Sequence, residues 1–209
     1  MRTKNAASPA LFRTYTVRGN ANDNCFIWEA ARATTAAVTF FKSIRICGPD
    51  GISEEFTDGG LKWNNPIKVV IEEGKRVFGP ERRVACVVSI GTGHRSAVGL
   101  ADADWYQALL PKNAIDLLQK LALDCEDKAI ECEKQYGQLP GLYYRFSVEH
   151  GLENVSLADW KLLSEVKTHT KAYLEMPLVE GKLNQLVDVL RSRNASITTA
   201  QLCTVHISA

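Results

Sequence analysis

The sequence predicts a mixed α/β fold, and three observations predict it. An amphipathic helix is expected at residues 67–78, the apolar run at 84–90 is typical of a buried strand, and residues 142–148 alternate as a second strand would. With the strand expected before Asp58, the helix at 67–78 and the strand at 84–90 give the order strand, helix and strand, which indicates an α/β sheet. With 209 residues and 45% hydrophobic content, the chain is large enough for one core.

Both ends of the helix at 67–78 are marked in the sequence. Asn64 and Asn65 are suited to capping, Pro66 suits the first helical position, and Gly79 with Pro80 ends the pattern. The strand at 84–90 is rich in β-branched residues and is expected to be a fully buried parallel strand. The apolar face predicted for the helix consists of Ile67, Val70, Ile71, Gly74, Val77 and Phe78.

Other elements are expected on either side of this unit. Residues 28–41 form an alanine-rich helix whose small face suits close packing, and a short strand is expected at 11–17. After residue 94 the pattern is mostly helical. The helices expected there span 104–110, 113–136, 156–175 and 178–190.

Composition excludes several classes of protein. The 25 basic and 24 acidic residues nearly cancel, so no nucleic-acid partner is expected. The six cysteines lack Cys-x-x-Cys spacing and the four histidines lie far apart, which indicates reduced thiols and neither a metal nor a cofactor. No stretch reaches the ~18 apolar residues of a membrane span, and residues 1–20 lack a signal-peptide core. We therefore expect a cytoplasmic protein.

The segment from Phe56 to Pro66 carries the strongest chemical signal. Asp58 is expected at the end of a strand, followed by two glycines that permit positive φ and a close approach of backbone. In open α/β sheets, reactive groups gather outside the carboxyl ends of the strands. A plain turn explains the same residues, because Asp and Gly dominate turns for conformational reasons. Both interpretations stay open on the residues alone.

Several segments together resemble the second half of a patatin-like phospholipase domain. Their order and spacing are similar to those of the family, and the closing segments at 143–146 and 151–174 resemble its fungal branch. The resemblance spans residues 11–190. The other segments that carry it are Ile27 to Ala37, Phe56 to Leu61, Asn64 to Pro66 and Val88 to Gly93.

The resemblance implies a three-layer α/β/α sandwich of patatin type, incomplete in this chain and with a helical C-terminal part. Residues 1–24 are then a poorly structured lead-in with one strand, residues 25–190 are the C-terminal portion of the domain, and residues 191–209 are a tail.

The family hydrolyses lipid acyl esters with a Ser-Asp dyad, so the resemblance implies a hydrolase of lipid degradation. Asp58 corresponds to the aspartate, which accepts the proton of the serine. The implied substrate is a phospholipid or another lipid ester, with peripheral membrane contact and without a cofactor. The residues that support the motif around Asp58 are Gly59, Gly60, Asn64, Asn65 and Pro66.

The serine of the dyad has no counterpart in this chain. The family places it in a Gly-x-Ser-x-Gly elbow, but Ser53 lacks the last glycine and Ser89 lacks the first. The early glycine-rich loop of the family is absent as well. We therefore expect the chain to be inactive alone and to require the missing N-terminal half of the domain. A catalytically dead module that binds lipid or a partner is the alternative, and a chain without a stable fold is a third.

For other polar groups, both a functional and a structural interpretation are possible. Gly91-Thr92-Gly93 can form a backbone nest for phosphate, but the P-loop lysine is missing and a structural turn is favoured. Packing or surface roles are favoured over a catalytic base for His94 and His169. The basic pairs Lys75-Arg76 and Arg82-Arg83 are expected to be solvated, with lipid headgroups as the alternative partner.

Overall fold

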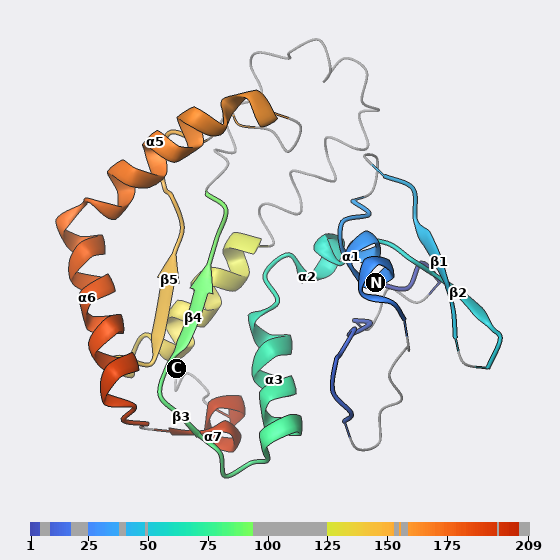
Figure 1. Ribbon diagram of the computed structural model, residues 1–209. Helices are drawn as coiled ribbons and strands as arrows, with labels where there is room; N and C mark the ends of the chain where they lie inside the picture. The colour runs from blue at the N-terminus through green and yellow to red at the C-terminus, as the bar shows by residue number, and fades with distance from the viewer. Residues whose placement is uncertain are drawn as a thin grey trace. The chain divides into compact units, whose positions relative to one another are not determined.

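The computed structural model in Figure 1 has a mixed α/β fold, as predicted. It describes residues 1–4, 9–17, 25–37, 41–48, 50–93, 125–152, 155, 159–195 and 197–204. Contacts divide the chain into two compact units, which are described separately. The first contains Met1–Pro66 and Asp104–Cys125, and the second contains Ile67–Ala103 and Glu126–Ala209.

The first unit contains a helix, a hairpin and a short second helix. The strands of the hairpin pair antiparallel, from Ile44 opposite Phe56 to Cys47 opposite Ser53. The turn between them includes Gly51, whose φ of 76° favours glycine. The elements are α1 (Ile27–Thr34), β1 (Ile44–Cys47), β2 (Ser53–Phe56) and α2 (Gly60–Trp63).

Helix α1 is shorter than the helix expected at 28–41. The Glu29 carboxylate accepts the Phe26 N–H at 2.8 Å and stabilises its beginning. At its end, the hydroxyls of Thr34 and Thr35 both donate to the Ala31 carbonyl at 3.0 Å. Threonine side chains that bond the backbone in this way compete with helix continuation. The prediction was therefore right for the first half of the segment and wrong at Thr35, where the helix has ended.

The core of the first unit uses the small face of this segment. Ala33 and Ala36 are 1% and 0% exposed, which confirms the predicted close packing. Ala33 belongs to a cluster with Ile46 and Phe56. The centroids of the Phe12 and Phe56 rings are 5.3 Å apart. The strand expected at 11–17 is wrong, because residues 11–16 pair with no strand and Phe12 instead packs onto this cluster.

The second unit contains the remaining described elements (Figure 1). Residues 125–136 are helical, as expected for that part of 113–136. The helix expected at 178–190 is confirmed, the one expected at 156–175 is an α-helix over 163–174 and a 3₁₀ turn over 160–162, and 104–110 lies outside the described residues. The helices are α3 (Ile67–Phe78), α5 (Leu163–Leu174), α6 (Pro177–Ser192) and α7 (Thr199–Thr204), with a 3₁₀ turn at Trp160–Leu162. The strands are β3 (Arg83–Val84), β4 (Val87–Ile90), β5 (Tyr143–Phe146) and β6 (Ile197–Thr198).

The predicted strand at 84–90 is divided between two sheets. Its first part, β3, pairs antiparallel with β6, and its second part, β4, pairs parallel with β5. The parallel orientation expected for this strand is confirmed for β4, although its partner β5 was not predicted. The sheets of the described residues have two strands each, β1 with β2, β3 with β6 and β4 with β5.

Helices cover both faces of β5. Tyr143 packs in a core with Ile71 of α3, Cys132 and Leu202 of α7. Phe146 points to the other face, in a cluster with residues of α5 and α6. Helix α6 contacts β5, and on β4 the side chains of Val88 and Ile90 are 41% and 79% exposed. The prediction that this strand is buried on both faces is therefore wrong for β4.

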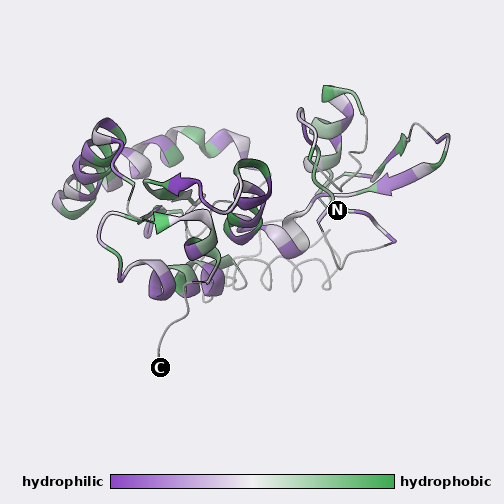
Figure 2. Ribbon diagram, turned by 90° about the horizontal axis from the view of Figure 1, so that it is seen from below, coloured by the Kyte–Doolittle hydropathy of each residue, from purple (hydrophilic) through white to green (hydrophobic). Residues whose placement is uncertain are grey.

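Helix α3 begins directly after Pro66, and hydrophobic and hydrophilic residues alternate along the helices (Figure 2). Of the predicted apolar face, Ile67 and Ile71 are buried, but Val70 and Phe78 are 60% and 65% exposed. Ile67 and Ile71 pack in the main core of the second unit with Cys132 and Leu202, and α3 contacts α7.

Residues 197–204, for which the sequence suggested no role, are part of the second unit. Ile197 and Leu202 are buried in its main core. The buried Thr199 hydroxyl lies 2.6 Å from the Gly79 carbonyl oxygen and 2.9 Å from that of Pro80, and donates to them. The end of the described chain therefore holds the turn after α3 in place. The proposed domain boundaries at residues 24 and 190 stay a prediction.

Candidate functional site

Asp58 lies directly after β2, at the position expected for it. Its N–H donates to the Ala36 carbonyl at 3.0 Å. The buried Thr57 hydroxyl donates to the same carbonyl oxygen at 2.7 Å. These two bonds attach the end of β2 to the segment that follows α1, so the backbone of Asp58 is held by residues of the first unit's core.

The carboxylate of Asp58 is half-buried, and one of its oxygens is occupied. Oδ1 accepts the Gly60 N–H at 2.7 Å, which closes an Asx turn at the beginning of α2. A Cβ on Gly60 would lie 3.4 Å from this oxygen, which is an ordinary van der Waals contact. The positive φ that the two glycines permit is not used, because Gly59 has a φ of −73° and Gly60 does not have a positive φ.

The second carboxylate oxygen, Oδ2, has no hydrogen-bond partner among the described residues. No arginine or lysine in the described ranges forms an ion pair with Asp58. The Met1 ammonium donates to the Thr57 carbonyl at 2.7 Å. Burial lowers the pKa of this amine, and the charge of Asp58 opposes that shift. The carboxylate is therefore positioned by one oxygen and open at the other.

The remaining residues of the motif lie between α2 and α3. Asn64 is the C-terminal cap of α2, with φ −60° and ψ −33°. Asn65 is buried and 5% exposed, and Pro66 immediately precedes Ile67, the first residue of α3. Asp58, Gly59, Gly60, Asn64, Asn65 and Pro66 all belong to the first unit. Asn64 therefore ends α2 instead of capping the beginning of α3, the role expected for it, and Ile67 is the first residue of α3.

Polar groups at the carboxyl ends of β4 and β5 have structural roles. Ser89 is buried, and its hydroxyl accepts a hydrogen bond from Arg145 Nη1 at 2.8 Å. A Cβ on Gly91 would lie 2.5 Å from Arg145 Nη2 and from Ser147 Oγ, so no side chain fits there. The structural interpretations of Ser89 and of the Gly91-Thr92-Gly93 turn are therefore favoured. His94 lies outside the described residues.

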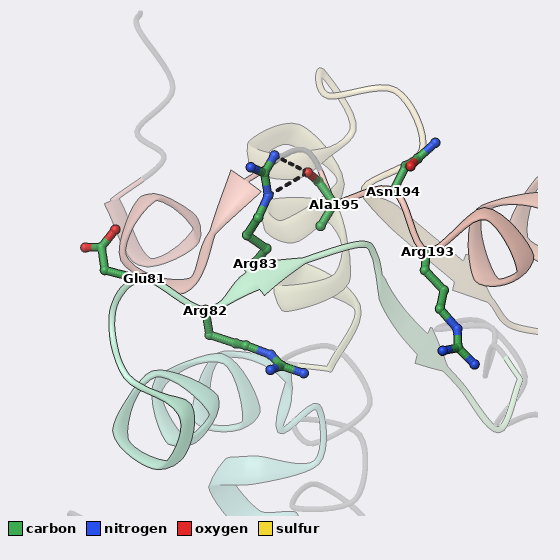
Figure 3. A pocket seen from close by; sticks show the side chains of 6 residues that line it. All are labelled: Glu81, Arg82, Arg83, Arg193, Asn194 and Ala195. Carbon is green, nitrogen blue, oxygen red and sulfur yellow. Dashed lines mark hydrogen bonds between the residues drawn. The ribbon is translucent and has the colours of Figure 1, made fainter.

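A pocket in the second unit is lined by six residues, of which three are arginines (Figure 3). It has a volume of about 830 Å³, and Arg83 Nε and Nη2 donate to the Ala195 carbonyl at 3.2 and 2.6 Å. The sequence identified Arg82-Arg83 as a basic pair but not Arg193, which is far away along the chain. The pairing of β3 with β6 and the hydrogen bonds of Arg83 to the Ala195 carbonyl bring the two regions together. The lining residues are Glu81, Arg82, Arg83, Arg193, Asn194 and Ala195.

The described part of the chain offers no group of three metal-ligating side chains. All six cysteines are free thiols. Burial raises the pKa of the Cys132 thiol, which reduces its reactivity as a nucleophile. Among the described residues, the helices are too short or too polar to cross a bilayer.

The geometry at Asp58 can support proton transfer to or from a hydroxyl group, and the arginine pocket can support binding of an anion. These two sites belong to different units and are treated independently. No protein-family model, curated protein or solved structure matches this chain.

Proposed function

We propose that this chain carries the aspartate part of a Ser-Asp lipid acyl hydrolase site of the patatin-like phospholipase type, with Asp58 as the proton acceptor. The observation that supports this proposal is that only one of the two carboxylate oxygens is occupied by a hydrogen bond. Oδ1 is held by the Gly60 N–H, and Oδ2 is without a partner in the described chain. A patatin-type three-layer α/β/α sandwich, completed by the missing N-terminal half, belongs to the same proposal.

The chemistry requires a serine within about 2.6–3.2 Å of the free oxygen. The serine oxygen attacks the ester carbonyl carbon, and its proton passes to Asp58. Asp58 then returns the proton to the alkoxide as the alcohol leaves and the acyl-serine forms. A water molecule then attacks the acyl-serine and gives its proton to Asp58. Asp58 returns this proton to the serine oxygen as the fatty acid is released. The chain has no Gly-x-Ser-x-Gly motif, so the serine and its oxyanion hole come from another segment.

Exposed apolar residues on the first unit support a requirement for a covering partner. Phe26, Ile27 and Trp28 are consecutive and are 70%, 85% and 62% exposed. Exposed apolar side chains that lie close together in sequence, here called the patch, are typical of an interaction surface in a stable protein. In the proposed enzyme, the N-terminal half of the domain covers this patch, and a phospholipid or another lipid ester at a membrane surface is the substrate.

The test is complementation followed by substitution of Asp58. The chain is expressed with a patatin-like N-terminal half that carries the serine elbow, and hydrolysis of a lysophospholipid and of a soluble ester is measured. Asp58→Asn keeps an oxygen that can accept the Gly60 N–H, so the turn is preserved while the base is lost. We expect the activity to fall by about 10²–10⁴-fold. Asp50→Asn is the matched control, because Asp50 Oδ1 accepts only the Ile52 N–H of a hairpin turn.

Full activity of the Asp58→Asn complex would contradict the assigned role. The second candidate is a catalytically inactive module, and the absence of a serine elbow favours it. It predicts that the complemented chain folds and hydrolyses neither substrate. Cooperative thermal unfolding of the chain alone separates both candidates from a chain without a stable fold.

A further inference from the structure

The arginine pocket of the second unit combines residues from two distant parts of the chain. Arg82 and Arg83 lie at the beginning of β3, and Arg193 follows the end of α6. The lining also contains one carboxylate, that of Glu81, so three positive charges face one negative charge. The volume of about 830 Å³ is in the usual range of ligand sites, which is about 300–1,000 Å³.

The backbone around this pocket is held by hydrogen bonds. Arg83 pairs with Thr198 in the β3–β6 ladder. The Thr199 N–H donates to the Arg82 carbonyl at 2.8 Å. Arg83 donates twice to the Ala195 carbonyl, as the dashed lines in Figure 3 show. Arg83 therefore holds the loop at Ala195 in place, so the backbone of the pocket is already formed before a ligand binds.

The charges of the pocket are not neutralised within the protein. Among the described residues, Arg82, Arg83 and Arg193 form no ion pair with a carboxylate. The Arg82 guanidinium lies 5.6 Å from the centre of the Phe78 ring, which orients it without removing its charge. In Figure 3 the Arg82 and Arg193 side chains extend away from Arg83, whose guanidinium group is turned toward Ala195.

We propose that this pocket binds a phosphate group, held by Arg82 and Arg193. A phosphate monoester carries a charge of about −1.5 to −2 at neutral pH, which matches the excess of positive charge in the lining. A carboxylate carries a single charge and matches it less well. Guanidinium groups offer paired N–H donors to phosphate oxygens. The inference is independent of Asp58, and it holds whether or not the chain has hydrolase activity.

Binding of inorganic phosphate to the full chain is the direct test, measured by calorimetry and by the rise in melting temperature at low ionic strength. Arg82→Gln and Arg193→Gln are each expected to weaken binding by about tenfold or more. Arg191→Gln is the matched control, because it removes the same charge from the same helix end outside the pocket. The melting temperature without phosphate shows that each variant is folded.

Two sources of the phosphate group are distinguished with vesicles. Phosphatidylcholine vesicles with and without phosphatidic acid are sedimented with the chain, in the presence and absence of inorganic phosphate. Binding that requires phosphatidic acid, is competed by phosphate and is lost in Arg193→Gln assigns the pocket to a lipid headgroup. Phosphate binding without vesicle binding assigns it to a soluble phosphate ester. The proposal is overturned if neither probe binds, if acetate binds as tightly as phosphate, or if Arg191→Gln weakens binding as much as the pocket variants do.

Discussion

The imidazole of His169 in α5 packs directly against the α-carbon of Gly151, in the loop after β5. A Cβ on Gly151 would overlap Nδ1 of His169, and the φ of Gly151 is 90°, in the region that favours glycine. The same imidazole has its Nε2 atom 4.0 Å from the Glu165 carboxylate. The loop and the helix are therefore joined at a point where only glycine fits, for two separate reasons.

Gly151→Ala is expected to lower the free energy of unfolding by about 2 kcal/mol or more, through the strained backbone and the overlap with His169. The double variant Gly151→Ala with His169→Ala is expected to lose only the backbone part of this cost, which is about 1 kcal/mol. Urea denaturation followed by circular dichroism measures both. A single variant as stable as the original chain would show that the contact between loop and helix does not exist.

Gly74 and Gly181 are the opposite case, because they lie inside helices α3 and α6 and a Cβ at either would meet no atom within 4 Å. Gly74→Ala and Gly181→Ala are each expected to raise the free energy of unfolding by about 0.5–1 kcal/mol, since alanine loses less conformational entropy in a helix. The same denaturation experiment checks this, and destabilisation would mean that an unseen neighbour occupies the space.

Thr199→Val is expected to destabilise the second unit by about 1–2 kcal/mol, because the buried hydroxyl that serves the carbonyls of Gly79 and Pro80 is removed without a change in shape. Thr199→Ser retains the hydroxyl and is expected to recover most of the loss. Thr204→Val is the control, since its exposed hydroxyl bonds only within α7. Equal unfolding midpoints for Thr199→Val and Thr204→Val would exclude a role for this contact.

Stability is expected to fall in alkaline solution, through Tyr136 and Tyr143. Burial raises the pKa of each phenol from 10 to about 12. Between pH 10 and pH 12 the folded state therefore holds protons that the unfolded state has lost, so the free energy of unfolding falls as the pH rises through this window. The full stabilisation is present below pH 10.

The tyrosine prediction is checked by urea denaturation across this pH range together with the absorbance of tyrosinate. Tyr136→Phe removes one titrating group and its hydrogen bond to the Leu202 carbonyl, which measures 3.3 Å. The variant is expected to be less stable at neutral pH and to show a shallower decline with pH. A flat stability profile for the original chain would mean that these phenols titrate as they do in water.

The sequence by itself determined the elements whose signals are local. Pro66 and the Gly79-Pro80 pair mark the two ends of α3, and the alanines after Trp28 predict the small buried face of Ala33 and Ala36. The strand character of β4 and β5 follows from β-branched and alternating residues, and the run at 84–90 indicated a parallel strand, whereas its pairing with β5 was not predicted. The position of Asp58 between β2 and α2 was predictable for the same reason, because the motif occupies a short continuous segment.

Tertiary structure alone decided the features that depend on distant partners. It divided 84–90 between two sheets, because β3 pairs with β6 from the far end of the chain. It left Val70 and Ile90 exposed, since no described helix covers them, and it placed Arg193 and Arg82 in the lining of one pocket. The periodicity of the sequence shows which residues are apolar. Whether those residues are buried, and which side chains come together in a pocket, depends on which elements pack against each other. That choice is made by contacts between segments far apart in sequence, which local patterns do not encode.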